Sequence, residues 1–305
     1  MLIGMVGLGR MGSDLVRHLL GKGHRVAGFD PVAPVRQELA KAGMLPADSL
    51  SSLFHLLRSE EGGGRSRIWL LIPSGPPVDD VLLQLTPLLV KGDVVVDAGA
   101  SRFTDTVRRS RLLAQSGLFL LDAGITIGTG DHLSLVVGGE KEPVADLGPV
   151  FDALSSAAGY LHAGPVGSGH FVKMVGEGIE SAFLQILSEG FDLMRHGPFD
   201  LDLAAISRIW AGGSVAGSRW LELLAHVFEG NPTLSSLRGY AESSDEVRWA
   251  GETAIEYKIF SPLLTLALMQ GSASRQGEIF STRLVAALRN ASGGHPALLE
   301  RGSSA

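Results

Sequence analysis

The first half of the chain alternates short apolar runs with stretches in which apolar residues recur at the spacing of a helix. The apolar runs are of strand length, and helical spacing follows at Ser13 to Leu20 and Ala33 to Ala42. Strands that alternate with helices usually pair in parallel, so we expect an α/β domain built on a parallel, doubly wound sheet. The predicted strands are Leu2 to Val6, His24 to Phe29, Ile68 to Ile72, Asp93 to Asp97, Leu118 to Leu121 and Ser134 to Val137.

The pattern changes after residue 163. A glycine-rich segment at 164–169 is followed by apolar residues at helical spacing from about residue 170 to beyond 194. Further stretches with helical spacing lie between residues 201 and 288, and strand-like runs are missing. We therefore expect two domains, a sheet-containing domain over residues 1–163 and an all-helical C-terminal domain over residues 164–305.

Composition fits two globular domains and narrows the chemistry. The chain has 305 residues, of which 45% are hydrophobic, enough for two separate cores. The formal net charge is −6 and the basic residues are scattered singly, which argues against a nucleic-acid partner. The sequence contains no cysteine, so disulfides, thiolate metal sites and a cysteine nucleophile are excluded.

The sequence carries no sign of export or of membrane insertion. The N-terminus leads directly into a predicted strand, and no charged segment precedes an apolar stretch as in a signal peptide. No apolar run approaches the ~20 residues that a membrane-spanning helix needs. We therefore expect a cytoplasmic protein without a membrane partner. Histidine and carboxylate residues do not recur at metal-ligand spacing, so no metal site is predicted.

A glycine fingerprint follows the first predicted strand. The residues Gly7-Leu8-Gly9-Arg10-Met11-Gly12 stand between that strand and a helical pattern, which is the context in which this spacing binds a dinucleotide. Gly7 would make the tight turn, Gly9 would let backbone N–H groups approach a pyrophosphate, and Gly12 would permit close packing of helix on strand. The helix N-terminus favours the anion. These features predict a Rossmann-type domain.

An acidic residue at the end of the second predicted strand indicates which dinucleotide binds. Asp30 stands 23 residues after Gly7, where its carboxylate can accept hydrogen bonds from the adenosine ribose hydroxyls and would repel a 2′-phosphate. The sequence therefore predicts NAD as the cofactor in preference to NADP. The alternative is a glycine-rich turn in another kind of α/β domain, in which Asp30 only caps a loop.

Several ordered segments beyond the fingerprint carry a resemblance to a known family. They are Ile72-Pro73-Ser74-Gly75, Asp97-Ala98-Gly99-Ala100-Ser101, Gly164-Pro165-Val166-Gly167-Ser168-Gly169-His170-Phe171-Val172-Lys173-Met174-Val175, Asp245-Glu246-Val247-Arg248-Trp249, and Ala287-Leu288-Arg289-Asn290 with Gly293-Gly294-His295. Over its whole length the chain resembles the 6-phosphogluconate dehydrogenases, especially their short, NAD-preferring bacterial form, within the β-hydroxyacid dehydrogenases. The resemblance implies a Rossmann domain followed by a helical domain. It also implies a homodimer, or a dimer of such dimers, in which the C-terminal segment reaches toward the partner's active site.

Three ionisable residues fall on one face of the helix that opens the second domain. Lys173, Glu177 and Glu180 stand at positions i, i+4 and i+7. The resemblance implies that Lys173 is the base that removes the hydroxyl proton as hydride leaves, and that Glu180 is the acid that returns a proton. It also implies that Ile72 and Pro73 contact the cofactor. The spacing alone would equally fit surface pairs that only stabilise a helix.

Several positions depart from the family pattern. The family's Lys-x-x-His-Asn-Gly-Ile-Glu-Tyr reads Lys173-Met174-Val175-Gly176-Glu177-Gly178-Ile179-Glu180-Ser181 here, so its histidine, asparagine and tyrosine are replaced. Its Asn-Ser pair is Ala100-Ser101, and its Ser-Gly-Gly cradle for the substrate carboxylate is Thr126-Ile127-Gly128. Ser101, Thr126 and Gly128 remain as expected substrate contacts. Glu177 would favour the charged form of Lys173 and repel a substrate carboxylate, unless Glu177 itself takes the proton.

Two residues near the C-terminus match the family's anion-binding pair. By this resemblance Arg289 would hold a phosphate through two parallel hydrogen bonds and His295 through one, which implies a phosphorylated small-molecule substrate. The alternative is that both are ordinary surface residues, since the intervening Asn290-Ala291-Ser292 is less aromatic than the family's usual stretch.

Three functions remain open at this point. The leading hypothesis is an NAD-dependent dehydrogenase that oxidises a secondary alcohol on a phosphorylated sugar acid or a close analogue. The second is a paralogue whose substrate, a phosphorylated polyol or cyclitol, lacks the carboxylate and is oxidised without decarboxylation. The third is an inactive NAD-binding scaffold or sensor, against which the retained Lys173 and Glu180 argue.

Overall fold

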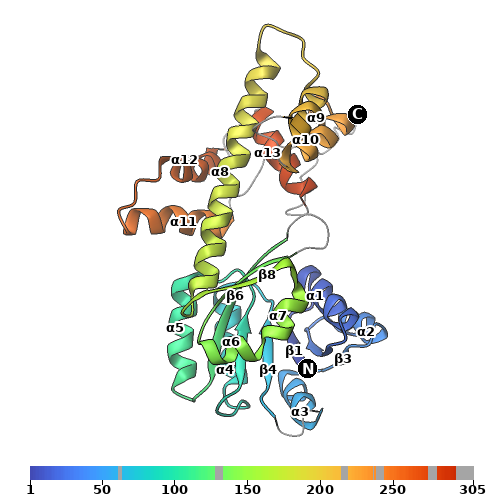
Figure 1. Cartoon of the computed structure of the whole chain (residues 1–305), viewed down its shortest axis with the longest axis vertical. Coiled ribbons are helices and arrows are strands. Elements are labelled where there is room, and N and C mark those ends of the chain that lie inside the picture. The colour runs from blue at the N-terminus through green and yellow to red at the C-terminus, as the bar shows by residue number, and fades with distance from the viewer. Residues whose placement is uncertain are drawn as a thin grey trace, which may run out of the picture. The chain divides into compact units, whose positions relative to one another are not determined.

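The chain folds into two compact units, Met1–Lys173 and Met174–Ala305 (Figure 1). The division falls after Lys173 rather than after residue 163, because the start of the long helix α8 (Ser168–His196) packs on the sheet of the first unit. The computed structural model describes residues 1–60, 64–127, 133–213, 219–235, 237, 244–273 and 280–292.

The first unit is built on one sheet. Within the described residues this sheet has eight strands, in the order β3-β2-β1-β4-β5-β6-β7-β8. Neighbouring strands pair in parallel except β6 and β7, which run antiparallel. The predicted α/β class with a following helical region is therefore confirmed. The strands are β1 (Leu2–Val6), β2 (Arg25–Phe29), β3 (Leu45–Pro46), β4 (Arg67–Leu70), β5 (Val94–Asp97), β6 (Phe119–Ile127), β7 (Leu133–Gly138) and β8 (Ser155–Gly164).

The observed sheet differs from the predicted one in the direction of β7, in the length of β6 and in the presence of β3 and β8. Strand β7 is antiparallel because residues 128–132, which separate it from β6, are too few for a helical crossover. Strand β6 runs on past Leu121 through Asp122, a charged residue that ended the predicted strand too early. Strands β3 and β8 were not expected, since β3 has only two residues and β8 is rich in small residues.

Helices cover both faces of the sheet, which is why its strands are apolar on both sides. All five residues of β1 are buried. Ile3 and Met5 join a core formed with α1, α6 and α7, whereas Leu2 and Val6 join a second core formed with α3, α4 and α5. The helices of this unit are α1 (Arg10–Gly21), α2 (Ala33–Lys41), α3 (Leu50–Glu60), α4 (Pro76–Leu85), α5 (Phe103–Ala114), α6 (Lys141–Asp146) and α7 (Gly148–Leu154).

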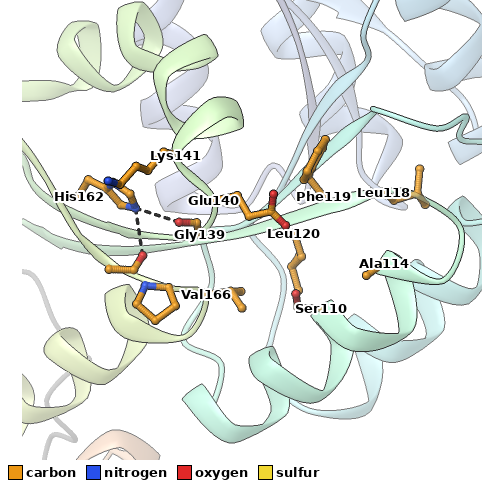
Figure 2. A pocket seen from close by; sticks show the side chains of 12 residues that line it. Ser110, Ala114, Leu118, Phe119, Leu120, Gly139, Glu140, Lys141, His162 and Val166 are labelled. Carbon is orange, nitrogen blue, oxygen red and sulfur yellow. Dashed lines mark hydrogen bonds between the residues drawn. The ribbon is translucent and has the colours of Figure 1, made fainter.

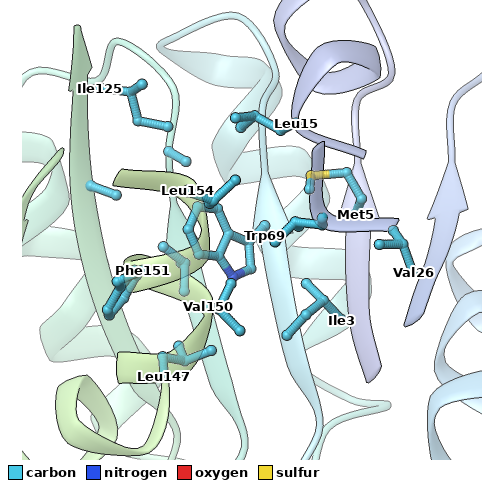
Figure 3. Close-up of a cluster of buried hydrophobic side chains, with 14 of the residues drawn as sticks. Ile3, Met5, Leu15, Val26, Trp69, Ile125, Leu147, Val150, Phe151 and Leu154 are labelled. Carbon is cyan, nitrogen blue, oxygen red and sulfur yellow. The ribbon is translucent and has the colours of Figure 1, made fainter. Parts of the chain in front are cut away.

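Trp69 of β4 lies at the centre of the first of these cores (Figure 3). Its ring is fully buried and lies 5.7 Å from the ring of Phe151 on α7. Leu15 of α1 and Met5 of β1 are parts of the same cluster (Figure 3). This packing holds α1, whose N-terminus carries the end of the glycine fingerprint, firmly against the central strands.

All the regular secondary-structure elements described in the second unit are helices, joined by turns and short loops. Its core contains Leu184 and Phe191 of α8, Leu224 and Phe228 of α10, and Leu288 of α13. No helix in the described ranges is long and apolar enough to span a membrane. Besides the continuation of α8, the helices are α9 (Leu203–Gly213), α10 (Arg219–Gly230), α11 (Asp245–Glu256), α12 (Pro262–Ala273) and α13 (Phe280–Ala291).

Candidate active site

The glycine fingerprint forms a tight loop between β1 and α1. Gly7 has a positive φ of 91°, and a Cβ added there would lie only 2.3 Å from the carbonyl oxygen of Leu71. A Cβ on Gly12 would lie 2.1 Å from the carbonyl oxygen of Gly7. Both positions therefore require glycine, Gly7 for the turn and Gly12 for the close approach of helix to strand.

Gly9 has a different environment from its two neighbours in the motif. It is the N-cap of α1, and a Cβ added there would meet no atom within 4 Å. Open space therefore lies where a pyrophosphate would approach the helix N-terminus. Arg10 is exposed beside Gly9, whereas the side chains of Leu8 and Met11 pack into the core. The Leu8 side chain is therefore turned away from a ligand, whereas Met11 is only partly buried.

Asp30 lies at the end of β2, next to this loop. Its Oδ2 accepts a hydrogen bond of 2.8 Å from the Leu8 N–H and its Oδ1 accepts one of 2.8 Å from the Val32 N–H. The side chain of Arg36 donates to the Asp30 carbonyl oxygen and to Asp48. The carboxylate is thus fixed beside the fingerprint, and the nearby guanidinium is already paired with an acidic residue.

The segments that follow β4 and β5 approach each other closely at the same edge of the sheet. A Cβ on Gly99 would lie 2.9 Å from the carbonyl oxygen of Ile72, while Pro73 is exposed. Ser101 is only 4% exposed, and its Oγ accepts a hydrogen bond of 3.1 Å from Arg109. Ser101, which is expected to contact substrate, therefore takes part in a buried hydrogen-bond network at this edge of the sheet.

The start of α8 packs directly on β6. A Cβ on Gly124 would lie 2.6 Å from the Gly169 carbonyl oxygen and 2.8 Å from the Cβ of Lys173. Lys173 is therefore held over the sheet within the first unit, which also carries the glycine loop and Asp30. Thr126, two residues beyond Gly124 on β6, is exposed.

A buried carboxylate that sequence reasoning missed fixes the N-terminus of α8. Asp122 of β6 is fully buried and accepts hydrogen bonds from the Gly167 N–H at 2.5 Å and the His170 N–H at 2.7 Å. A carboxylate at this position also complements the helix dipole. The sequence holds no local signal for this contact, because Asp122 lies inside β6 and its two partners come 45 and 48 residues later in the chain.

The second unit brings three predicted residues together. On α13, Arg289 donates a hydrogen bond of 3.3 Å to Ser181 Oγ on α8. Burial lowers the pKa of the Arg289 guanidinium, and the nearby carboxylates of Glu177 and Glu180 oppose that effect. The expected anion-binding arginine therefore lies near Glu177 and Glu180, two of the three expected acid–base residues. Gly128 and His295, also expected to contact substrate, lie outside the described residues.

The first unit also contains a pocket between α5, β6 and the end of β8 (Figure 2). It opens beside the start of β6 and is bordered by Ser110 of α5 and by Glu140, whereas the fingerprint and Asp30 lie at the carboxyl ends of the strands. His162 Nε2 donates to the carbonyl oxygens of Gly139 at 2.9 Å and Gly164 at 3.0 Å, which ties the ends of β7 and β8 together. The described lining of this pocket contains none of the predicted site residues.

Comparison with known proteins identifies the family. The family model described as the NAD binding domain of 6-phosphogluconate dehydrogenase matches residues 2–164. The chain belongs to the 6-phosphogluconate dehydrogenase family. A Haloferax volcanii relative named 6-phosphogluconate dehydrogenase, NAD(+)-dependent, decarboxylating, is 38% identical over 297 residues, which cover 97% of this chain and 98% of the relative.

Solved structures extend the likeness to the fold of the whole chain. A 6-phosphogluconate dehydrogenase from Plasmodium falciparum, solved as the apo form, with NADP+ and with 6-phosphogluconate, has a TM-score of 0.81 and 22% identity, covering 100% of this chain and 67% of its own. A 3-hydroxyisobutyrate dehydrogenase from Salmonella typhimurium has a TM-score of 0.71 and 21% identity, covering 93% and 98%. The expected dehydrogenase family, its dinucleotide-binding domain and its fold are confirmed.

Proposed function

We propose that this member of the 6-phosphogluconate dehydrogenase family oxidises a secondary alcohol on a phosphorylated sugar acid, or on a close analogue, with NAD. The observation that carries the proposal is the position of Lys173. Its Cβ lies against β6 at Gly124, within the compact unit that also holds the glycine loop and Asp30. A lysine so placed can act as base on an alcohol whose hydride passes to a bound dinucleotide.

The residues of the first unit fit a dinucleotide. The open space at Gly9 and the N-terminus of α1 would hold the pyrophosphate. Each oxygen of the Asp30 carboxylate accepts one backbone N–H and has further lone pairs with which to accept from ribose hydroxyls. Ile72 and Pro73 would border the other half of the cofactor. NAD held by these residues would supply the hydride acceptor.

NAD is favoured over NADP by charge. A 2′-phosphate would stand beside the Asp30 carboxylate and would be repelled by it. Arg36, the guanidinium next to Asp30, donates to Asp48 at 3.0 Å and to the Asp30 carbonyl oxygen, so it is committed within the protein. An added phosphate would therefore have to displace an existing ion pair to gain this cation.

The acid and base roles fall to three residues of α8. Lys173 Nζ would take the substrate hydroxyl proton, and the Glu180 carboxyl would return a proton to the product. Glu177 stands one turn after Lys173 on the same helix, where it would stabilise the charged lysine or accept the proton itself. Its presence in place of the family's asparagine is the clearest difference in the proposed chemistry.

A second candidate substrate class follows from the charges around Arg289. This guanidinium would hold a substrate phosphate, with His295 as a further donor. Because Glu177 and Glu180 lie near it, an additional substrate carboxylate would meet like charge. Ser101, Thr126 and Gly128 are proposed as further substrate contacts on the strength of the family resemblance. A phosphorylated polyol or cyclitol without the carboxylate, oxidised without decarboxylation, avoids the repulsion between like charges.

We also propose that the enzyme is a homodimer. Three large apolar side chains, Ile179, Ile186 and Leu193, recur every seven residues along α8 and are 59%, 52% and 77% exposed. Phe260, at 93%, and Met269, at 62%, are also exposed in the same unit. A second copy of the chain that covered these side chains would remove this apolar surface from water.

The proposed function is tested by screening NAD reduction over 6-phosphogluconate, other aldonate phosphates and polyol phosphates without a carboxylate, with CO₂ measured alongside. NADH formation with at least one phosphorylated alcohol is expected. NADH without CO₂ on a polyol phosphate would select the second substrate class. NAD binding without turnover on any compound would favour the inactive scaffold or sensor.

A further inference from the structure

The buried face of α5 carries two polar side chains that reach different parts of the candidate active site. Thr106 is fully buried and Arg109, one turn later, is 1% exposed. Buried polar groups are retained where their hydrogen bonds are satisfied, and removal of one partner leaves the other unpaired. The partners of these two side chains therefore indicate what α5 holds in place.

Thr106 holds the turn of α8 that precedes Lys173. Its Oγ1 lies 2.8 Å from His170 Nδ1, and His170 is 2% exposed. His170 Nε2 is buried without a hydrogen-bond partner among the described residues. Within those residues, the hydrogen bond with Thr106 is therefore the only one that the imidazole ring makes. His170 stands three residues before Lys173 on α8, and a rotation of the ring's turn would displace the lysine.

Arg109 holds the segments that follow β4 and β5. Its Nη2 donates to the Gly75 carbonyl oxygen at 2.9 Å and its Nη1 donates to Ser101 Oγ at 3.1 Å. Its Nε donates to Asp79 at 3.0 Å, and Nη1 lies 3.7 Å from the buried Oδ2 of Asp97. The hydrogen bond from Arg109 is the main reason that the pKa of Asp79 lies below its usual value. One guanidinium thus joins both strand ends.

We propose that Thr106 and Arg109 are positioning residues, which make α5 a bracket between the turn that carries Lys173 and the Gly75 and Ser101 segments. All the contacts lie within the first unit. Misplacement of a reacting group by about 1 Å can cost roughly a hundredfold in rate. The proposal rests on the proposed function in one respect, that Lys173 is the base.

Thr106→Val tests the first arm of the bracket, because valine keeps the shape and removes the hydroxyl. We expect kcat with the best substrate of the panel to fall roughly ten- to a hundredfold, while the Kd for NAD changes less than about twofold. The primary deuterium isotope effect on kcat, measured with substrate deuterated at the carbinol carbon, should rise because the chemical step becomes slower. Thr106→Ser, which restores a hydroxyl, should recover most of the lost kcat.

Thr86→Val is the matched control for this substitution. Thr86 Oγ1 donates to the carbonyl oxygen of Leu82 four residues earlier, as Thr106 Oγ1 does to that of Arg102, but among the described residues it does not hydrogen-bond to a histidine. Thr86→Val should leave kcat and the isotope effect unchanged. If Thr106→Val has a lower melting temperature but a wild-type kcat and isotope effect, Thr106 has only a structural role and the proposal is overturned.

Arg109→Lys tests the second arm, since lysine keeps the charge but lacks the planar guanidinium whose separate nitrogens bond Gly75, Ser101 and Asp79. The matched control is Arg108→Lys, because Arg108 pairs with the same Asp79 at 2.9 Å but has a side chain that is 49% exposed. We expect kcat to fall at least tenfold in Arg109→Lys only. Equal effects in the two variants would overturn the second arm. If Lys173→Met keeps its turnover, the proposed function fails instead.

Discussion

Gly124→Ala tests whether the position of Lys173 depends on its contact with β6. The new methyl group would lie 2.6 Å from the Gly169 carbonyl oxygen and 2.8 Å from Lys173 Cβ, whereas ordinary contacts begin near 3.4 Å. Neither neighbour is the free end of a flexible side chain. Helix α8 and strand β6 must therefore part by roughly 0.6 to 0.8 Å to accept it, at a cost of about 1–3 kcal/mol in stability.

The same displacement moves the proposed base away from its position. Since misplacement by about 1 Å can cost roughly a hundredfold in rate, we expect kcat to fall about ten- to a hundredfold. The Kd for NAD should change less than about twofold, because the nucleotide loop lies at β1 and β2. Steady-state NADH formation at 340 nm gives kcat, and calorimetry gives the Kd.

Gly190→Ala provides the control on the same helix. A Cβ there would meet nothing within 4 Å, so the substitution should only raise helix stability, by roughly 0.5–1 kcal/mol. Its kcat should equal that of the wild type. If Gly124→Ala keeps full kcat at saturating substrate, the contact between β6 and Lys173 does not set the rate and the reasoning is wrong.

Three further predictions concern the cofactor, the substrate and assembly. NAD should bind at least about tenfold more tightly than NADP, or roughly 1.4 kcal/mol, and equal affinities by calorimetry would remove Asp30 from its proposed role. If the substrate belongs to the second class, without the carboxylate, activity on 6-phosphogluconate should be weak, because each carboxylate hydrogen bond left unmade costs on the order of 1.5–3 kcal/mol. Glu177→Asn with Gly176→His should then shift kcat/KM toward 6-phosphogluconate, whereas efficient wild-type turnover with stoichiometric CO₂ would contradict this class and select the sugar acid. Ile186→Glu should be a monomer when its mass is measured by light scattering, whereas the wild type should be a dimer. A wild-type chain that is already monomeric at micromolar concentration would rule the dimer out.

The sequence predicted best where local pattern and packing agree. Strand β1 was predicted with its observed bounds because all five of its residues are buried between helices on both faces. The long α8 was recognised from its helical spacing. The glycine fingerprint was readable because the turn at Gly7 and the close approach at Gly12 admit no side chain, and such constraints leave a direct mark on the sequence.

The contacts between distant segments could not be read from the sequence. Nothing in the spacing showed that Asp122 would cap α8 45 residues later in the chain, at Gly167. Ser101 was expected at the substrate, but its position depends on Arg109 from the next helix, a pairing that only the fold defines. The proximity of Arg289 to Glu177 and Glu180 likewise depends on how α13 packs on α8.

The most direct test of the account is a single-turnover measurement of NAD reduction by wild type and by Lys173→Met, with the best phosphorylated substrate of the panel. Methionine keeps an unbranched side chain nearly as long as that of lysine and removes the amine. We predict that the wild type reduces bound NAD in one rapid phase, and that Lys173→Met binds NAD with an unchanged Kd but reduces it at least about a thousandfold more slowly, within the range expected for loss of a general base. Reduction by Lys173→Met at the wild-type rate would contradict the central claim.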